Sequence, residues 1–118
     1  MCIRDRSNKG LLAILWEMFP NHPNLLPASF QRSDFTGPCV EKPLHGREGQ
    51  GVRILQDEAG LPAPCVWQAY QPLPNHDGFR PVIGSWVIDG VSAGVGIRED
   101  VTEITGNASR FTPHYFKP

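Results

Sequence analysis

The sequence has 118 residues, and its 11 basic and 12 acidic side chains give a formal net charge of −1. This length suffices for one small domain with one core, and the near-balance of charge gives no electrostatic argument for nucleic-acid binding. No apolar run is long enough to span a membrane, and Lys9 interrupts the apolar start, which argues against a secretory signal peptide. Three cysteines without a CxxC pair indicate a reducing compartment, so we expect a cytoplasmic protein.

The first seven residues match nothing that follows them in pattern. Met1-Cys2-Ile3-Arg4-Asp5-Arg6 resembles the translated adapter sequence found at the ends of some proteins predicted from environmental DNA. We therefore interpret residues 1–7 as a non-native or artefactual N-terminus, and the alternative is a natural, frayed end. On this interpretation the natural protein begins upstream and the chain is a fragment of it.

Residues 9–19 are predicted to form a helix that Ser7 or Asn8 caps and Pro20 ends. Apolar side chains leave it almost no polar face, which is typical of a helix buried on most sides. A chain of 118 residues has little other material to bury such a helix. We therefore expect a missing N-terminal part of the same protein to cover one side of it.

A glycine-rich loop between two strands follows a turn-rich stretch, residues 21–38. Residues 39–40 are predicted to end the first strand and residues 52–55 to form the second, with Lys42 at the mouth of the loop and glycines at positions 46, 49 and 51. Glycine lets backbone N–H groups approach a ligand, and successive N–H groups can form an anion-binding nest. A lysine beside them suits a phosphate. This pattern predicts a loop over the phosphates of a nucleotide, and the alternative is an ordinary hairpin with a solvated lysine.

The order of these residues excludes two better-known phosphate motifs. In a Walker loop the glycines precede the lysine and a helix follows, whereas here Lys42 comes first and a strand follows. A Rossmann fingerprint also needs a helix directly after its glycines.

Three further strands are predicted downstream. A connector, residues 57–64, leads to a buried strand at 65–70, and strands at 81–88 and 91–98 are joined by the two-residue turn Asp89-Gly90. Glycines inside the last strand mark close approach of a ligand or another backbone. The charged triplet 98–100 is expected at the end of that strand. The order of elements favours an α+β fold with an antiparallel sheet.

Three pieces of the sequence have chemistry that suits a nucleotide. The first is Lys42 with its loop, where His45 can also touch a phosphate. The second is the strand around Trp67 and Tyr70, whose end can offer backbone groups to an adenine edge, although such residues more often belong to a core. The third is Arg98, a bidentate cation that can neutralise a transferring phosphoryl group; its alternative is a solvated turn. The four histidines lack metal-site spacing, and no serine lies in a nucleophile elbow.

Several strings resemble, in order, the C-terminal part of the glutathionylspermidine synthase family of the ATP-grasp superfamily, in particular its single-domain bacterial homologues. The strings are NKGLL (8–12), LWEMFPNHPNLLP (15–27), KPLHGREG (42–49), QPLP (71–74), IGSW (83–86), GVGIRED (94–100) and SRFTPH (109–114). The resemblance begins at about residue 8 and extends to the end of the chain. It implies that residues 8–118 form a partial ATP-grasp domain.

The resemblance implies an ATP-dependent carboxylate–amine ligase, in which ATP phosphorylates a carboxylate and an amine attacks the acyl phosphate to form an amide. By position, Lys9 and Lys42 match two lysines that contact the ATP phosphates, and Arg98 matches the arginine that stabilises the transition state of phosphoryl transfer. The loop that covers the phosphates contributes Glu48 and Gly49. The segment that holds adenine is Gln68, Ala69, Tyr70 and Gln71. Ala69 departs from the polar or acidic residue of many relatives, but its backbone can still serve adenine.

The resemblance also implies Mg²⁺, which bridges the phosphates during transfer. The family's metal ligands and glutathione-contacting residues are expected upstream of this sequence, so no residue here is assigned to a metal. The implied partners are a small glutathione- or peptide-like acid and a polyamine-like amine, with no nucleic acid and no membrane. The alternative function is a non-catalytic nucleotide- or anion-binding module. Acidic metal ligands in the upstream genomic sequence would favour the enzyme over this module.

Overall fold

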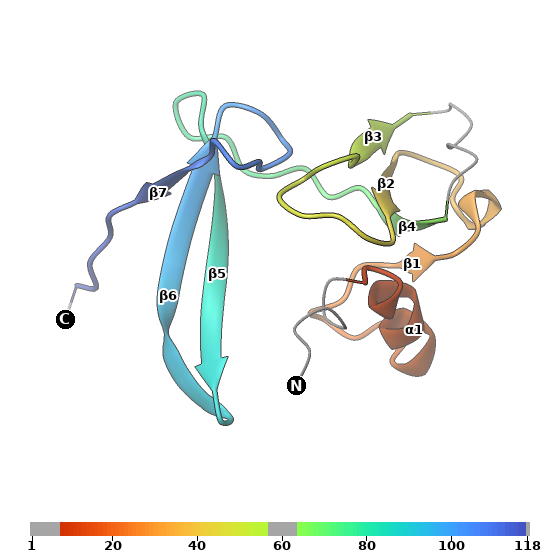
Figure 1. Cartoon of the computed structure of the whole chain (residues 1–118), viewed down its shortest axis with the longest axis horizontal. Helices are drawn as coiled ribbons and strands as arrows, with labels where there is room; N and C mark the ends of the chain where they lie inside the picture. The colour runs from red at the N-terminus through yellow and green to blue at the C-terminus, as the bar shows by residue number, and fades with distance from the viewer. Residues whose placement is uncertain (1–7, 57–63, 118) are drawn as a thin grey trace. The chain divides into compact units, whose positions relative to one another are not determined.

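The computed structural model describes residues 8–56 and 64–117, which belong to two compact units that divide after Gln71. The described residues form one α-helix, one short 3₁₀ helix and seven strands in two antiparallel sheets, labelled in Figure 1. The predicted α+β class with antiparallel pairing is confirmed. No helix among these residues has the length and apolar character needed to cross a membrane.

The first unit builds a four-stranded sheet. Its elements are α1 (Leu11–Met18), β1 (Ala28–Ser29), η2 (Arg32–Asp34), β2 (Cys39–Pro43), β3 (Arg53–Leu55) and β4 (Cys65–Ala69). The strand order is β1-β4-β2-β3, and every neighbouring pair is antiparallel. The predicted strands around the glycine loop and after the connector are confirmed, and β2 extends further than expected, so that Lys42 lies inside it. The predicted connector, residues 57–64, lies outside the described residues except for Pro64.

The prediction of a helix buried on most sides is wrong for the described residues. In α1 only Ala13 is buried, whereas Leu11, Ile14 and Met18 are between 46% and 62% exposed. The helix packs on β1 and β4 with one face, and the core there is small. The core residues are Ala13, Ala28 and Val66, with Leu12, Trp16 and Leu44 packed against them. The number of apolar residues in the helix therefore does not show how many of its faces are buried.

The ends of α1 lie inside the predicted limits. The helix begins after Gly10, whose N–H donates to Asn8 Oδ1 at 2.9 Å, and it ends before Phe19, whose N–H donates to the Leu15 carbonyl at 2.9 Å. Ser7, the other predicted cap, lies outside the described residues. Lys9 thus lies in the turn before the helix, which leaves its side chain free to reach another segment.

The second unit is a long hairpin with a third short strand. Its strands are β5 (Arg80–Ile88), β6 (Val91–Asp100) and β7 (Arg110–Thr112), in the order β5-β6-β7. Asp89 and Gly90 have φ of 50° and 76°, the positive values that a two-residue hairpin turn needs. A β-bulge lies between Trp86 and Val87. The charged triplet 98–100 forms the end of β6, as expected, and the strand reaches Asp100 because β5 and β7 pair with it there.

Candidate functional site

Lys9 fastens the glycine loop of the first unit at two points. Its main-chain N–H donates to the Leu44 carbonyl at 2.8 Å, and its Nζ donates to the Gly46 carbonyl at 2.8 Å. The two residues of the second contact are 37 positions apart in sequence. The turn before α1 is therefore held directly against the loop.

Lys42 contacts the neighbouring strand β4. Its Nζ donates to Gln68 Oε1 at 2.6 Å, because Lys42 pairs with Val66 and the Gln68 side chain leaves the same face of the sheet two residues further along. Burial lowers the pKa of Lys42, and the positive charge of Lys9 lowers this pKa further. The structure therefore brings two of the predicted phosphate ligands close enough for their charges to interact.

The two lysines are held by neutral oxygens. Within residues 8–56 and 64–117 the salt bridges join Arg53 to Glu41, Arg80 to Glu103 and Arg110 to Glu99, and none includes a lysine. A partly desolvated ammonium group without a carboxylate partner is stabilised by an incoming anion. An anion beside the Lys9–Lys42 pair would therefore be favoured by its charge.

The glycine loop is shaped by left-handed backbone conformations. Glu48 and Gly49 have φ of 52° and 76°, and Gly51 has φ of 70°. Two turns close the loop, in which the Gln50 N–H donates to the Arg47 carbonyl at 2.9 Å and the Val52 N–H donates to the Gly49 carbonyl at 3.0 Å. A Cβ on Gly51 would lie 2.8 Å from Pro43 Cγ, so the loop is folded back onto the end of β2.

The predicted adenine segment has part of its hydrogen-bonding capacity already used. The Ala69 N–H donates to the Pro27 carbonyl at 2.8 Å, and the Tyr70 N–H donates to the Pro38 carbonyl at 3.3 Å. The Gln68 amide oxygen accepts from Lys42. These N–H groups are therefore not available to an adenine edge, whereas Gln71 is exposed.

A buried ion pair clasps the two strands that carry the glycine loop, and the sequence interpretation missed it. Glu41 is fully buried in β2 and pairs in register with Arg53 of β3. Its Oε2 accepts from Arg53 Nη2 at 2.6 Å and from Arg53 Nε at 2.9 Å. The sequence did contain an indication of this pair, because Glu41 and Arg53 flank the predicted loop on opposite strands. Opposite charges on paired strands favour a cross-strand contact.

Arg98 lies in the second unit, in β6. Its Nη2 donates to the Gly106 carbonyl at 2.6 Å and to the Ser109 carbonyl at 3.3 Å, and its guanidinium lies 5.2 Å from the centroid of the Phe111 ring. Its Nε is buried without a hydrogen-bond partner among the described residues. The guanidinium is thus positioned within the fold and is not part of a solvated turn.

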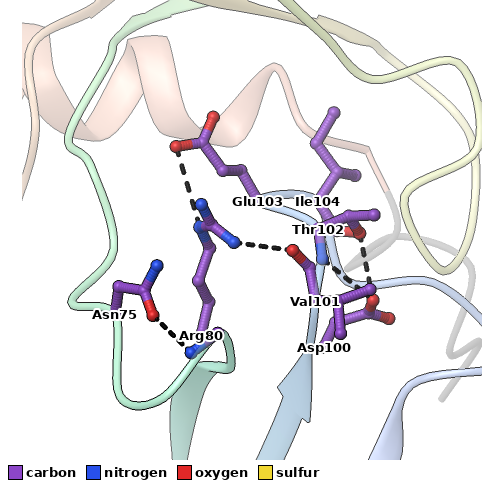
Figure 2. A network of polar contacts seen from close by, with 8 residues as sticks. Asn75, Arg80, Asp100, Val101, Thr102, Glu103 and Ile104 are labelled. Atoms are coloured by element: carbon purple, nitrogen blue, oxygen red, sulfur yellow. Dashed lines mark hydrogen bonds and ion pairs between the residues drawn. The ribbon is translucent and has the colours of Figure 1, made fainter.

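The loop whose carbonyls hold Arg98 is fixed by Asp100. The carboxylate accepts from Ser109 Oγ and from the N–H and Oγ1 of Thr102, both at 3.1 Å, while Ser109 Oγ accepts from the Gly106 N–H at 2.8 Å. The hydrogen bond from Ser109 is the main reason that the pKa of Asp100 lies below its usual value, and those from Thr102 add to it. Figure 2 shows Asp100 and Thr102 beside the contacts of Arg80 with Glu103 and Val101.

No cluster of three or more histidine, cysteine, aspartate or glutamate side chains suited to a metal ion occurs in the parts of the chain that the structure describes. Glu48 and His45 are exposed in the glycine loop. The described site therefore consists of cations, backbone groups and amides. Groups of these kinds bind phosphates or carboxylates in proteins.

The described chain thus combines a lysine pair and a glycine loop with an antiparallel α+β fold. Comparison with known families makes the class specific: the profile of the family described as Glutathionylspermidine synthase preATP-grasp matches residues 6–117. The chain belongs to this family, as the sequence resemblance implied.

Relatives of this chain are named as ligases or synthetases. It is 43% identical to a "Putative acid–amine ligase" of Haemophilus influenzae, over 95% of this chain and 33% of the relative. It is 32% identical to the trypanothione synthetase of Crithidia fasciculata, over 89% of this chain and 18% of that protein. It is 30% identical to the bifunctional glutathionylspermidine synthetase/amidase of Escherichia coli, over 90% of this chain and 19% of that protein. The chain thus spans a third or less of these relatives.

Proposed function

We propose that residues 8–118 are a partial ATP-grasp domain and serve an ATP-dependent carboxylate–amine ligase. The observation that carries the proposal is the Lys9–Lys42 pair, which is held on a glycine loop by neutral oxygens in a family whose relatives are named as ligases. Two neighbouring cations without a carboxylate partner among the described residues suit the phosphates of a nucleotide, and burial lowers the pKa of one of them, Lys42.

In the proposed reaction a carboxylate oxygen attacks the γ-phosphorus of ATP, the bond to the β,γ-bridging oxygen breaks, and ADP leaves. The amine nitrogen then attacks the acyl carbon, phosphate leaves with the bonding electrons, and the nitrogen loses a proton to give the amide. Lys9 and Lys42 bind the phosphates, Glu48 and Gly49 cover them, and Arg98 balances the charge of the transferring group. Mg²⁺, when bound, neutralises the phosphate oxygens. No metal ligand is assigned to this chain.

We propose that the substrates are a small peptide-like or glutathione-like acid and a polyamine-like amine. The names of the relatives support these two classes, because two of the relatives are named for glutathionylspermidine or trypanothione synthesis. We propose that Gln68, Ala69, Tyr70 and Gln71 line the adenine side. The N–H groups of Ala69 and Tyr70 are already bonded, so in this proposal other groups of the segment, such as the exposed Gln71, contact the adenine.

The test is calorimetric titration of ATP with Mg²⁺ into the full-length natural protein that contains this sequence. Lys42→Met keeps the apolar stem and removes the charge, and we expect it to weaken ATP binding by roughly tenfold to a hundredfold, the value of one charged hydrogen bond. Lys117→Met, which removes an exposed lysine of the second unit, is the control and should bind as the wild type does. Equal ATP affinity in both variants would contradict the proposal.

A trapping experiment tests the acyl phosphate. Hydroxylamine supplied in place of the amine should yield an acyl hydroxamate only when ATP and an acid substrate are both present. Arg98→Met should bind ATP normally and form little hydroxamate. Formation of AMP and pyrophosphate instead of ADP and phosphate would exclude this mechanism.

The second candidate is a non-catalytic anion-binding module. The bonded N–H groups of Ala69 and Tyr70 favour it, because they leave fewer donors for a nucleobase. Inorganic tripolyphosphate discriminates the two: binding as tight as that of ATP, without turnover in the presence of acids and amines, would support the module.

A further inference from the structure

Lys42 has the surroundings of a nucleophilic amine. The sequence contains three lysines, of which Lys9 and Lys42 are half-buried beside the glycine loop and Lys117 is exposed. Burial lowers the pKa of Lys42, and the positive charge of Lys9 lowers it further. A lysine that is desolvated, or that lies next to a second cation, keeps more of its amine unprotonated at neutral pH and is thereby activated as a nucleophile.

The hydrogen-bond partner of Lys42 is compatible with a neutral amine. Its Nζ donates to the amide oxygen of Gln68 at 2.6 Å. An unprotonated amine still has two N–H groups, so it can keep this hydrogen bond while its lone pair points elsewhere. A carboxylate in the place of the amide would favour the protonated form. The neighbouring Glu41 does not supply one, because it leaves β2 on the opposite face of the sheet and pairs with Arg53.

Lys9 adds a positive charge that the glycine loop holds in place. Its Nζ donates to the Gly46 carbonyl and its main-chain N–H to the Leu44 carbonyl, both at 2.8 Å. An ammonium group has three N–H donors, so two remain for a phosphate when one is used by Gly46. A phosphate bound there lies close to Lys42, since the two lysines are near enough for their charges to interact. An acyl group attached to that phosphate would therefore be held beside a nucleophilic amine.

We propose that Lys42 is a site of acylation by acyl phosphates, the small anions in which a carboxylic acid is joined to phosphate. Lys9 binds the phosphate group, and the unprotonated amine of Lys42 attacks the acyl carbon. The N–C bond forms, the bond from the acyl carbon to the phosphate oxygen breaks, phosphate leaves with the bonding electrons, and the nitrogen loses a proton to solvent. The product is an uncharged acyl-lysine. The binding of the phosphate by the pair rests on the proposed function, whereas the ligase reaction is not needed.

Acylation of Lys42 would act on the proposed nucleotide site. It removes one of the two positive charges and adds an acyl group beside the loop. We expect the acylated protein to bind ATP about as weakly as Lys42→Met does. The modification would thus lower the activity of the protein when acyl phosphates accumulate.

The test uses acetyl phosphate and a neutral acetyl donor, the thioester S-acetyl-N-acetylcysteamine, each incubated with the full-length natural protein. Peptide mass spectrometry follows the acetylation of each lysine with time. We expect acetyl phosphate to acetylate Lys42 about tenfold faster than Lys117, the effect of one unit of pKa on the unprotonated fraction. Tripolyphosphate should slow the reaction at Lys42 and leave that at Lys117 unchanged. Equal rates at the two lysines, or a rate at Lys42 that ignores tripolyphosphate, overturns the proposal.

Lys9→Met separates the binding of the phosphate from the reactivity of the amine. The rate at Lys42 with acetyl phosphate is divided by the rate with the neutral thioester, so that the reactivity of the amine cancels. We expect Lys9→Met to lower this ratio about tenfold, the value of one charged hydrogen bond. Arg47→Met removes an exposed cation of the same loop and is the matched control, with an unchanged ratio. An unchanged ratio in Lys9→Met contradicts the proposed role of Lys9.

Gln68→Glu tests the neutral partner of Lys42 and leaves both lysines in place. The carboxylate should raise the pKa of Lys42, so both donors should acetylate Lys42 about tenfold more slowly. Thermal unfolding shows whether the variant is folded. Acetylation as fast as in the wild type would mean that the amide oxygen has no part in keeping Lys42 reactive, and it would overturn the argument from its partner.

The hydroxamate assay on the same samples separates this inference from the proposed function. Acetylation of Lys42 at the expected rate in a protein that forms no hydroxamate would remove the ligase reaction and retain the modification site. Hydroxamate formation in a protein whose Lys42 stays unmodified by acetyl phosphate would retain the ligase and overturn the inference.

Discussion

The two units hold their positive charges in different ways. In the second unit Arg110 pairs with Glu99 at 2.7 Å, and Arg80 lies 3.9 Å from Glu103. In the first unit the lysines 9 and 42 donate only to a carbonyl and an amide oxygen. The first unit also has an apolar core, whereas the one buried residue among those described in the second is Ser109.

We call a charge with a partner of opposite sign matched. Strand pairing and polar contacts join the elements of the second unit, where Arg80 and Arg110 are matched and Arg98 is held by carbonyl oxygens. In the first unit neither Lys9 nor Lys42 has a carboxylate partner among the described residues, and burial lowers the pKa of Lys42. We infer that matched charges stabilise the fold and that the unmatched lysines serve a ligand. The first unit itself provides the internal contrast, because its Glu41–Arg53 pair is matched and lies one residue from Lys42 in β2. Removal of a matched charge should destabilise the fold, and removal of an unmatched one should reduce binding.

The largest effect on stability is expected for Arg53→Met. It removes the guanidinium that pairs with the fully buried Glu41 carboxylate, and the loss of one partner of a buried ion pair destabilises proteins by roughly 3–5 kcal/mol. Chemical denaturation measures the change in the free energy of unfolding. Arg47→Met, an exposed arginine of the glycine loop, is the control and should stay within about 0.5 kcal/mol of the wild type. Similar stability of both variants would contradict the claim that a charge with a partner of opposite sign stabilises the fold.

Gly51→Ala should have the next largest effect. Its Cβ would lie 2.8 Å from Pro43 Cγ at a φ of 70°, and a clash with positive φ costs about 1–3 kcal/mol. Thermal unfolding would show the loss. Gly37→Ala has open space and no left-handed backbone, so it should be close to neutral. A neutral Gly51→Ala would mean that the loop does not fold back on β2.

Ser109→Ala tests the contacts that hold the loop behind Arg98. It removes the donor to Asp100 and the acceptor of the Gly106 N–H, for which we expect about 1–2 kcal/mol. The pKa of Asp100 should return towards its ordinary value. In the wild type, Asp100 stabilises the fold above pH 3.8, and this contribution is lost as the pH falls through its lowered pKa. In Ser109→Ala the free energy of unfolding should therefore change less with pH in this range. Carboxyl NMR titration measures the pKa, and an unchanged value would contradict the assignment. Ser92→Ala, an exposed serine of β6, is the control.

Lys42→Met should have the smallest effect on stability and may be compared directly with Arg53→Met. The lowered pKa of Lys42 means that the unfolded chain binds its proton more tightly, so wild-type stability rises with pH between the lowered pKa and 10.5. Lys42→Met should be at least as stable at neutral pH and should lose this rise. Denaturation at pH 7 and above measures both effects. A loss of more than about 1 kcal/mol at neutral pH would place Lys42 among the structural charges.

Local patterns predicted the parts of the fold that local physics decides. Asp89-Gly90 was expected to turn and adopts the positive φ values of such a turn. The glycine loop was also expected and is present, although Lys42 lies inside β2 rather than in the loop. The strands β1 and β7 have two and three residues, too few for a period of two to be recognised. The burial of α1 was overestimated, because apolar composition does not identify the surfaces that cover a helix.

The contacts of the site depended on pairings that no local pattern contains. Lys9 reaches Gly46 across 37 positions, and the Glu41–Arg53 pair depends on the register of a hairpin whose loop length had to be known first. The role of Lys9 came from the family resemblance alone, whereas the local patterns also suggested those of Lys42 and Arg98; all three remain predictions. The structure adds what the resemblance lacked, namely the neutral partners of the lysines and the loop that positions Arg98.

The most direct measurement of the central claim is the pKa of Lys42 in the free and the ATP-bound protein. It can be followed by ¹³Cε NMR of the full-length protein, with Lys42→Met to assign the resonance. The unmatched-charge account predicts a pKa below 10.5 in the free protein and a rise when ATP or tripolyphosphate supplies the missing negative charge. A pKa at or above 10.5 in the free protein, or one that ATP leaves unchanged, would contradict it.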